Sequence, residues 1–412
     1  MKKKDNAPIV MISSYPPRLC GIATFTEEAR EFIRKNHPER DVLVISHIDG
    51  EGEGVFPIID MSIRNWWKIV AEKIKKLKPY VVHVEHEYGL YEYYDKRGIG
   101  DGNEGFLRLL EAIGEFPIIV EPHTIHGRMR DFEADFVYRM CELSDIVLFK
   151  CHYQKWRLDW SFSIRGWKTP LNIMVVPHGA RTDKRWGPEE IPKLKEEIGL
   201  TCLPHIGEHL VGLVGWVQSN KRWDILISMW EEITTTIEKQ TNQHWDLLAA
   251  GAMRDINDLK EYEKYKAQVE FLAKKGFAHY YEFIPRGEMY YKVMAICDFI
   301  VIPSIDETQS GTLARVIALN KPFITTAPME GLTAQAIESE GGLLFTTKDM
   351  LKKQVIRLAC DERLRFELGE NLKKYLENTV AWEKVANQYD EAYNLAREAK
   401  KKGIRIELPL EF

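Results

Sequence analysis

The segment 303–313 places a carboxylate and several small residues directly after a short apolar run. Its sequence is Pro-Ser-Ile-Asp-Glu-Thr-Gln-Ser-Gly-Thr-Leu. The first turn of a helix leaves backbone N–H groups without helical partners, and such groups bind anions. We therefore predict that Glu307 accepts hydrogen bonds from sugar hydroxyls and that the following amides hold a phosphate. These amides belong to Ser310, Gly311, Thr312 and Leu313. Ser310 as an ordinary helix N-cap is compatible with this role.

A basic segment, 214–223, follows another apolar run and contains Lys221 and Arg222 just before a predicted helix. Positive side chains beside a helix N-terminus favour a diphosphate, because the helix dipole adds to their charge. Lys221 and Arg222 are therefore predicted diphosphate ligands. A solvated surface pair is the alternative.

Near the N-terminus, Gly21 and Ile22 lie between a predicted strand and a predicted helix. A glycine at such a turn lets the backbone approach a ligand closely, and the helix start offers N–H groups to an anion. The dinucleotide pattern Gly-x-Gly-x-x-Gly is absent here. A tight turn without a ligand is an equally weighted alternative.

Two further segments place histidines at the ends of predicted strands. In the first, His86 and Glu87 follow the strand 80–84, where open α/β sheets bind their ligands. In the second, His123 and His126 follow the strand 117–121 and precede a glycine. We predict that His86, Glu87 and His126 contact an acceptor and that His123 has a functional role. A lone histidine is more often structural, but two within four positions favour function.

A metal site at the first of these segments would need converging histidine and glutamate side chains. Alternate residues of a strand share a face, so His83, Glu85 and Glu87 would lie on one face and His86 on the other. Hydrogen bonding to an acceptor is favoured over metal binding, and no metal site is predicted.

Short apolar runs alternate with longer amphipathic segments, a pattern typical of parallel βαβ units. Continuous apolar runs such as 118–120 suit a sheet covered on both faces. In the first half we predict strands at 8–13, 41–46, 80–84, 117–121, 146–150 and 173–176, and helices at 26–35, 63–77, 105–113 and 132–142. In the second half we predict strands at 209–214, 246–250, 280–284, 299–303 and 323–326, and helices at 223–234, 256–275, 288–295 and 313–319.

The two series predict an α/β protein of two Rossmann-like, doubly wound parallel-sheet domains that face a cleft. The first domain covers 1–183, with a C-terminal helix at about 380–400 added to it. Residues 184–207 are the predicted interdomain connection, and 208–379 form the second domain. The turn 176–180 is a candidate hinge.

The composition excludes several classes of function. Hydrophobic residues make up 45% and charged residues 29% of 412, which suffices for two globular cores. A net charge of -5 gives no support to a nucleic-acid-binding surface. The six cysteines lack Cys-x-x-Cys spacing, which favours scattered thiols in a reducing cytoplasm. No run of about 18 apolar residues occurs, so no transmembrane segment is expected, while peripheral membrane contact stays open.

These motifs together resemble family 4 glycosyltransferases, which have the GT-B fold and transfer sugars with retention. The likeness covers nearly the whole chain, through Pro16-Pro17-x-x-Cys20-Gly21-Ile22, His123, Pro177-His178-Gly179, Pro303-Ser304-x-x-Glu307 and Ala381-Trp382-Glu383-Lys384-Val385-Ala386. The segment 306–311 is most similar to a bacterial mannosyltransferase-like subgroup.

The resemblance implies that the C-terminal domain holds a nucleotide-sugar, the N-terminal domain holds the acceptor, and the last helix crosses back to the first domain. It implies catalytic roles for Lys221, which neutralises the donor diphosphate, for Glu307, which binds the transferred sugar, and for His123 near that sugar. The implied donor-binding residues are Gly21, Ile22, Arg222, Ile284, Arg286, Ser310, Gly311, Thr312, Leu313 and Arg315. Among these, Gly21 and Ile22 lie near the phosphates and 284–286 meets the base.

Two positions depart from the family's pattern. The family usually has a second glutamate eight positions after the first, which binds ribose hydroxyls, and this place is Arg315 here. The usual Gly-Arg before the diphosphate lysine is Gly215-Trp216. Either Arg222 or Arg315 compensates, or the donor is not an ordinary nucleotide-sugar.

The favoured hypothesis is retaining transfer of a hexose, with mannose from GDP-mannose preferred, to a sugar or sugar-containing acceptor. No strict Asp-x-Asp pair occurs, so we expect neither a cofactor nor an essential metal. A phosphorylase that uses phosphate or sugar 1-phosphate is an alternative motivated by Arg315. A non-catalytic sugar- or nucleotide-binding protein is another, motivated by both departures.

Overall fold

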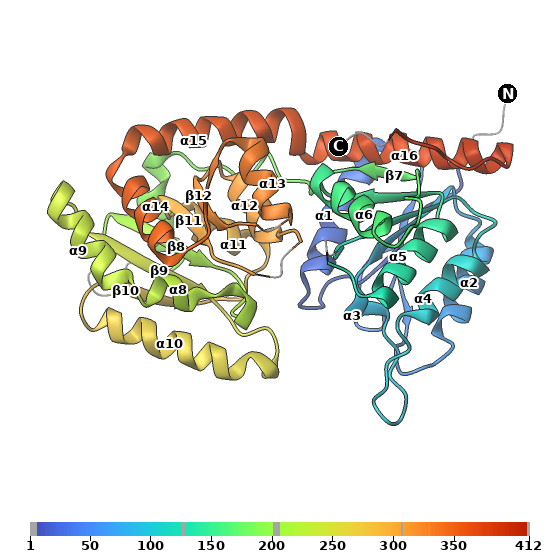
Figure 1. Ribbon diagram of the computed structural model, residues 1–412, viewed down its shortest axis with the longest axis horizontal. Helices are drawn as coiled ribbons and strands as arrows, with labels where there is room; N and C mark the ends of the chain where they lie inside the picture. The colour runs from blue at the N-terminus through green and yellow to red at the C-terminus, as the bar shows by residue number, and fades with distance from the viewer. Residues whose placement is uncertain (1–5, 126–127, 201–206, 306–307, 329, 410–412) are drawn as a thin grey trace. The chain divides into compact units, whose positions relative to one another are not determined.

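The computed structural model describes residues 6–125, 128–200, 207–305, 308–328 and 330–409 (Figure 1). The chain divides into two compact units. Unit 1 comprises the residues up to His178 together with those from Trp382 onward, and unit 2 runs from Gly179 to Ala381.

In the described part of unit 1, seven parallel strands form one sheet in the order β3-β2-β1-β4-β5-β6-β7. The strands are β1 (Ile9–Ser13), β2 (Val42–His47), β3 (Val55–Ile59), β4 (Val81–His86), β5 (Ile118–Pro122), β6 (Ile146–Phe149) and β7 (Ile173–Val175). The helices are α1 (Gly21–Asn36), α2 (Trp66–Leu77), α3 (Tyr88–Tyr91), α4 (Glu104–Ala112), α5 (Asp131–Leu143), α6 (His152–Ser163) and α16 (Trp382–Lys402). Strands β1, β4 and β5 are buried along their whole length, as their apolar sequences predict.

The C-terminal helix α16 belongs to unit 1, as the resemblance predicts (Figure 1). Its buried face includes Trp382, Tyr389 and Tyr393, each with 0% exposure. The Trp382 ring stacks on Phe32 at 5.8 Å between centroids, and its indole N–H donates to Glu28 at 3.2 Å. The helix therefore completes the core of unit 1.

In the described part of unit 2, six parallel strands form a sheet in the order β10-β9-β8-β11-β12-β13. The strands are β8 (His209–Val214), β9 (Trp245–Gly251), β10 (Ala278–Glu282), β11 (Phe299–Ile302), β12 (Phe323–Thr326) and β13 (Gly342–Phe345). The α-helices are α7 (Ile191–Glu197), α8 (Trp223–Ile227), α9 (Trp230–Thr241), α10 (Leu259–Ala273), α11 (Gly287–Ala295), α12 (Gly311–Ala318), α13 (Glu330–Ser339), α14 (Lys348–Cys360) and α15 (Glu362–Tyr375). Short helical turns lie at η1 (Pro188–Glu190), η3 (Ser219–Lys221), η4 (Ile256–Asp258) and η5 (Leu376–Val380).

The segment expected to connect the domains contributes to the core of unit 2. Leu194 and Ile198 are 3% and 5% exposed and pack with Leu210 and Tyr291. The charged residues of this segment face solvent, so its composition resembles a linker although one face of α7 is buried.

Several elements differ from the sequence prediction. Strand β3 was not predicted because it contains Pro57, which suits the edge of the sheet that it occupies. Helix α6 was not predicted because Trp156 and Trp160 lie exposed and blur its amphipathic pattern. The predicted helix 223–234 is divided into α8 and α9 at Ser228, whose hydroxyl donates to the carbonyl of Ile225 at 3.0 Å.

Each sheet reverses its strand order at one point. In unit 1 this point lies between β1 and β4, and in unit 2 it lies between β8 and β11. Open parallel sheets bind ligands at the carboxyl ends of the strands that flank such a switch point. The residues that follow β1, β4, β8 and β11 are therefore candidate ligand-binding residues.

Candidate functional site

The switch point of unit 2 joins the two segments that carry most of the predicted donor residues. Strands β8 and β11 pair side by side, with Phe299 opposite Val211. Beyond the strands, the N–H of Ile305 donates to the carbonyl of Asn220 at 2.8 Å. The turn that ends at Lys221 therefore lies directly beside the loop that leads to α12. Glu307, in that same loop, lies outside the described residues.

Gly215, the first residue after β8, is in close contact with the start of α12. Its φ is +144°, and an added Cβ would lie 2.9 Å from the Tyr290 hydroxyl and 3.5 Å from Thr312 Oγ1. The Tyr290 and Thr312 hydroxyls are hydrogen-bonded at 2.7 Å. A side chain at position 215 would be strained and crowded, so glycine lets α11 and α12 close on the end of β8.

Ser310 is the N-cap of α12, and its Oγ accepts a hydrogen bond from the Leu313 N–H at 3.4 Å. The amide of Leu313 therefore contacts the cap, and its role as a phosphate ligand stays a prediction. Gly311 and Thr312 are half-buried in the first turn. Their amides and the helix dipole stay the predicted anion-binding groups at this end of α12.

Arg315 is buried, at 7% exposure, and contacts the first turn of α12. One of its guanidinium N–H groups donates to the Gly311 carbonyl at 2.7 Å. The guanidinium also lies 4.9 Å from the Tyr290 ring centroid and 5.4 Å from that of Tyr291. Cation–π contacts of this kind stabilise a buried arginine. Arg315 therefore holds the first turn of α12 in place.

Lys221 ends η3 and is half-buried, while Arg222 adopts a left-handed conformation with φ 50°. The Arg222 guanidinium pairs with Asp224 at 3.2 Å. Although burial opposes ionisation, this pair lowers the pKa of Asp224, which stays charged at neutral pH. Asp224 thus offsets the charge of Arg222, and Lys221 stays a predicted diphosphate contact.

The remaining predicted donor residues lie after β10, two strands away from the switch point. Ile284 is 53% exposed, and its carbonyl accepts a hydrogen bond from the N–H of Arg286 at 2.7 Å. Arg286 precedes the first residue of α11. This segment forms an exposed turn at the same edge of the sheet.

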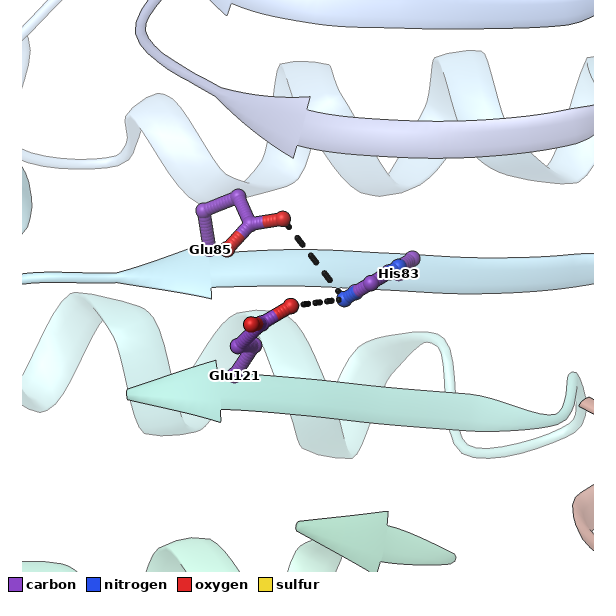
Figure 2. A group of neighbouring side chains, drawn as sticks. All are labelled: His83, Glu85 and Glu121. Carbon is purple, nitrogen blue, oxygen red and sulfur yellow. Dashed lines mark hydrogen bonds and ion pairs between the residues drawn. The ribbon is translucent and has the colours of Figure 1, made fainter. Parts of the chain in front are cut away.

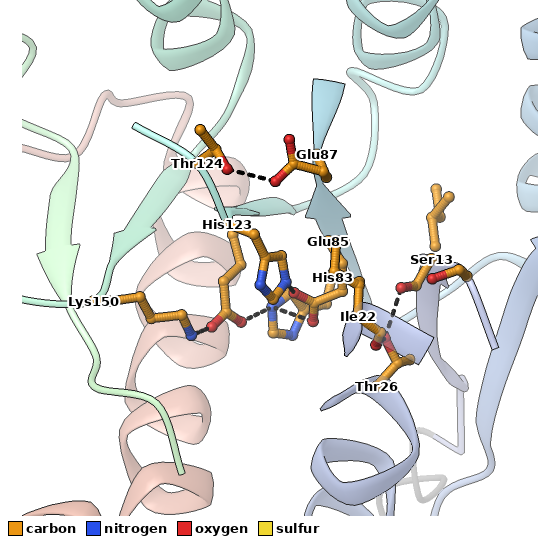
Figure 3. A network of polar contacts seen from close by, with 12 residues as sticks. Ser13, Ile22, Thr26, His83, Glu85, Glu87, His123, Thr124 and Lys150 are labelled. Atoms are coloured by element: carbon orange, nitrogen blue, oxygen red, sulfur yellow. Dashed lines mark hydrogen bonds and ion pairs between the residues drawn. The ribbon is translucent and has the colours of Figure 1, made fainter. Parts of the chain in front are cut away.

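In unit 1, Gly21 and Ile22 open α1 directly after the loop that follows β1. An added Cβ at Gly21 would meet nothing within 4 Å, so the turn itself does not require glycine. The Ile22 carbonyl accepts from the Thr26 hydroxyl at 2.9 Å, and that hydroxyl also contacts Ser13 at 2.6 Å (Figure 3). The start of α1 is thus fixed to β1, while open space surrounds Gly21.

His86 does not lie where an acceptor contact would need it. Its side chain is 1% exposed, bonds Asn103 at 3.2 Å and packs among Tyr91, Phe106 and Phe136. Burial lowers its pKa to about 3, so the ring is neutral. We therefore assign His86 to the packing of unit 1 rather than to acceptor binding.

Glu87 stays at the edge of the sheet. Its carboxylate accepts from the Tyr88 N–H at 3.0 Å and from the Thr124 hydroxyl at 2.6 Å (Figure 3). It thereby joins the ends of β4 and β5. His126, the third predicted acceptor residue, lies outside the described residues.

Beneath this edge lies a buried cluster of ionisable side chains that the sequence did not reveal as a unit (Figures 2 and 3). The register of β4 and β5 sets Glu85 opposite Glu121. His83 Nε2 lies 2.9 Å from Glu121 and 3.6 Å from Glu85, and all three side chains have 0% exposure. The ammonium of Lys150, which follows β6, forms an ion pair with Glu121.

This cluster also contacts α16 and His123. The hydroxyls of Tyr393 and Tyr389 bond His83 Nδ1 at 2.7 Å and Glu121 at 3.1 Å. Glu85 bonds the Nε2 of His123 at 2.9 Å. The clue in the sequence was a set of charged residues at the ends of buried strands, but only the strand register shows that they converge.

His83, Glu85 and Glu121 are close enough together to hold a metal ion. The strand periodicity grouped His83 and Glu85 with Glu87, but in the structure the third member of the group is Glu121. Lys150 lies against the same carboxylates and pairs with Glu121, so it offsets part of their negative charge. Burial lowers the pKa of Lys150 to about 7, and the charge of Glu85 opposes that shift.

Comparison with known proteins supports a transferase. Residues 203–375 match the family described as Glycosyl transferases group 1. An uncharacterized glycosyltransferase of Methanocaldococcus jannaschii is 30% identical over 139 residues, which are 31% of this chain and 36% of that protein. The match thus spans about a third of that relative's length.

Solved structures extend the likeness in fold to nearly the whole chain. Anabaena HepE, in complex with UDP, matches with a TM-score of 0.68 at 13% identity, covering 94% of this chain and 99% of that one. The sucrose-phosphate synthase of Thermosynechococcus elongatus matches with a TM-score of 0.64 at 14% identity, covering 95% and 100%. WaaG, a glycosyltransferase involved in lipopolysaccharide biosynthesis, matches with a TM-score of 0.59 at 13% identity, covering 96% and 99%. These matches confirm the predicted fold class of two Rossmann-like parallel-sheet domains.

Proposed function

We propose that this chain is a glycosyltransferase that moves a hexose from a nucleotide-sugar to a sugar or sugar-containing acceptor. The observation that carries this proposal is the hydrogen bond from Ile305 to Asn220, which sets the Lys221 turn beside the loop before α12. Both segments lie within 203–375, the region that matches glycosyl transferases group 1. A cation and a helix N-terminus at one switch point suit a diphosphate.

Catalysis then rests on stabilising the leaving diphosphate. Lys221 and the first-turn amides of α12 would contact the oxygens on which negative charge develops as the glycosidic bond breaks. The departing phosphate oxygen takes the proton of the acceptor hydroxyl. Glu307 holds hydroxyls of the transferred sugar, and His123 contacts the same sugar. Retention of the anomeric configuration is proposed on the resemblance to family 4.

The preferred donor is GDP-mannose, on the resemblance of the segment 306–311 to mannosyltransferase-like sequences. The competing donor is UDP-glucose, because Anabaena HepE was solved with UDP-glucose. Peripheral membrane contact stays a proposal for acceptor access. None of the helices in the described part of the chain has a stretch long and apolar enough to cross a bilayer.

A thermal-shift screen of the full chain tests donor binding. The ligands are GDP-mannose, UDP-glucose, GDP, UDP, inorganic phosphate and sugar 1-phosphates. A donor at 100 times its Kd should stabilise the protein by about 2.7 kcal/mol and raise the melting temperature. Lys221→Ala should remove most of this shift, whereas Lys239→Ala, which removes an exposed charge from α9, should keep it.

A shift with phosphate or a sugar 1-phosphate, and none with any nucleotide, would favour the phosphorylase instead. Equal shifts in both lysine variants would contradict the assignment of the diphosphate site to the β8–β11 edge.

A further inference from the structure

His123 is held in one orientation by groups of unit 1. Its backbone N–H donates to the His86 carbonyl at 2.8 Å. Its ring meets Phe25 edge-on, with 4.9 Å between centroids and an interplanar angle of 86°. Its Nε2 lies 2.9 Å from a carboxylate oxygen of Glu85, and the side chain is 6% exposed. The ring is therefore positioned by β4 and α1 as well as by its own segment (Figure 3).

Glu85 is a buried anion that the surrounding cluster maintains. Burial alone would raise its pKa, but His83, His123 and Lys150 outweigh this effect and lower the pKa. Its second oxygen has no hydrogen-bond partner in the described part of the chain and lies 3.6 Å from His83 Nε2. A buried carboxylate with an unsatisfied oxygen costs free energy, so packing alone does not account for it.

The chemistry of the contact fixes the proton on the imidazole. An ionised carboxylate only accepts hydrogen bonds, so Nε2 of His123 must carry the hydrogen. In the neutral ring Nδ1 is then the basic nitrogen. The same carboxylate would also stabilise a positive charge on the ring, because the two groups are buried together.

We propose that Glu85 is a positioning residue for His123, which fixes its tautomer and orientation toward the transferred sugar. This inference rests on the proposed function, in which His123 contacts the donor sugar. The nearby His83, His123 and Lys150 keep Glu85 ionised.

Glu121 provides a matched control for a purely structural role. It is as deeply buried as Glu85, comes from the neighbouring strand and contacts the same His83. It contacts His83, Lys150 and Tyr389, and no contact between it and His123 is seen among the described residues. Loss of either charge should weaken unit 1, but only loss of Glu85 should act on His123.

The kinetic test compares Glu85→Gln, Glu121→Gln, His123→Ala and the double variant Glu85→Gln/His123→Ala in glycosyl transfer. Glu85→Gln should lower kcat by about 10–100-fold, as loss of a group that orients a functional histidine typically does, and leave the donor KM within about threefold. Glu121→Gln should keep kcat within about threefold while the protein stays folded. The double variant should be no slower than His123→Ala, because Glu85 acts through His123.

A second readout does not depend on turnover. Nitrogen NMR of ¹⁵N-histidine-labelled protein at pH 8 should show His123 as the Nε2–H tautomer, and Glu85→Gln should populate both tautomers. The inference is overturned if the His123 ring of the wild type carries its hydrogen on Nδ1. It is also overturned if the losses in kcat of Glu85→Gln and His123→Ala multiply in the double variant. If the wild type transfers no sugar from any donor, the proposed function fails, and the NMR result still decides whether Glu85 fixes the ring.

Discussion

Lys150 shows how strongly one residue depends on its partners. Its side chain is 3% exposed, and its ammonium pairs with Glu121 and lies 4.6 Å from the Phe25 ring centroid. Replacing it with methionine keeps the volume but leaves two buried carboxylates without their cation. Breaking a buried ion pair by removing one partner costs about 3–5 kcal/mol.

Lys150→Met should therefore lower the free energy of unfolding by about 3–5 kcal/mol in urea denaturation. The double variant Lys150→Met/Glu121→Gln should recover part of that loss, because it also removes the negative charge of Glu121, which would otherwise be buried without its cation. A loss below about 1 kcal/mol in the single variant would mean that the ion pair carries little of the stability.

A substitution at Gly21 distinguishes an effect on ligand binding from an effect on folding. Since an added Cβ meets nothing within 4 Å, Gly21→Ala should change the free energy of unfolding by less than about 1 kcal/mol. If the backbone here approaches the donor phosphates, the same change should lower donor-dependent activity several-fold. Gly215→Ala is the contrast, because its φ of +144° and the Tyr290 hydroxyl at 2.9 Å predict destabilisation. Full activity of Gly21→Ala would show that no ligand comes close to this turn.

Among the elements, β2 and β4 make unit 1 sensitive to acid. They carry His47, His83 and His86, whose pKa values burial lowers, to about 4 for His47 and about 3 for His86. In the unfolded chain these rings titrate near pH 6.5. Between about pH 6.5 and 4 the unfolded state therefore binds more protons, so the free energy of unfolding falls as the pH falls.

We expect protonation of His47 and of His86 each to lower the free energy of unfolding by about 1–2 kcal/mol between pH 7 and pH 5. Urea denaturation at both pH values measures the slope. His86→Phe, which suits a site among Phe106 and Phe136, should make the slope shallower. A stability that is constant from pH 7 to pH 5 would contradict the burial of these rings.

The elements also show what the sequence could predict. Parallel strands were predictable because runs such as Ile118 to Val120 are apolar without alternation, and the ends of β4, β5, β8 and β11 already pointed to the candidate site. The buried cluster was not predictable, because Glu85 meets Glu121 only through the register of two strands. Helix α16 then adds Tyr389, which lies 268 positions beyond Glu121, and Tyr393. His86 was misjudged because its position after a strand resembles that of a ligand-binding residue, while its burial depends on helices α4 and α5.

At the scale of the whole molecule, the two units resemble known proteins in different ways: unit 2 in sequence and fold, and unit 1 in fold. The match to glycosyl transferases group 1 covers 203–375, which lies within unit 2. Unit 1 is recognised through the fold, at identities that leave its substrate open.

The most direct test of the central claim is the reaction itself, measured with the full chain, GDP-mannose or UDP-glucose and a panel of carbohydrate acceptors. Mass spectrometry of the glycoside and quantification of the released nucleoside diphosphate should give equal amounts of both products. Lys221→Ala should lower this rate by about 10²-fold, as loss of a group that stabilises the leaving charge typically does. Wild-type turnover in that variant, or formation of sugar 1-phosphate from an oligosaccharide and phosphate without any nucleotide, would contradict the account.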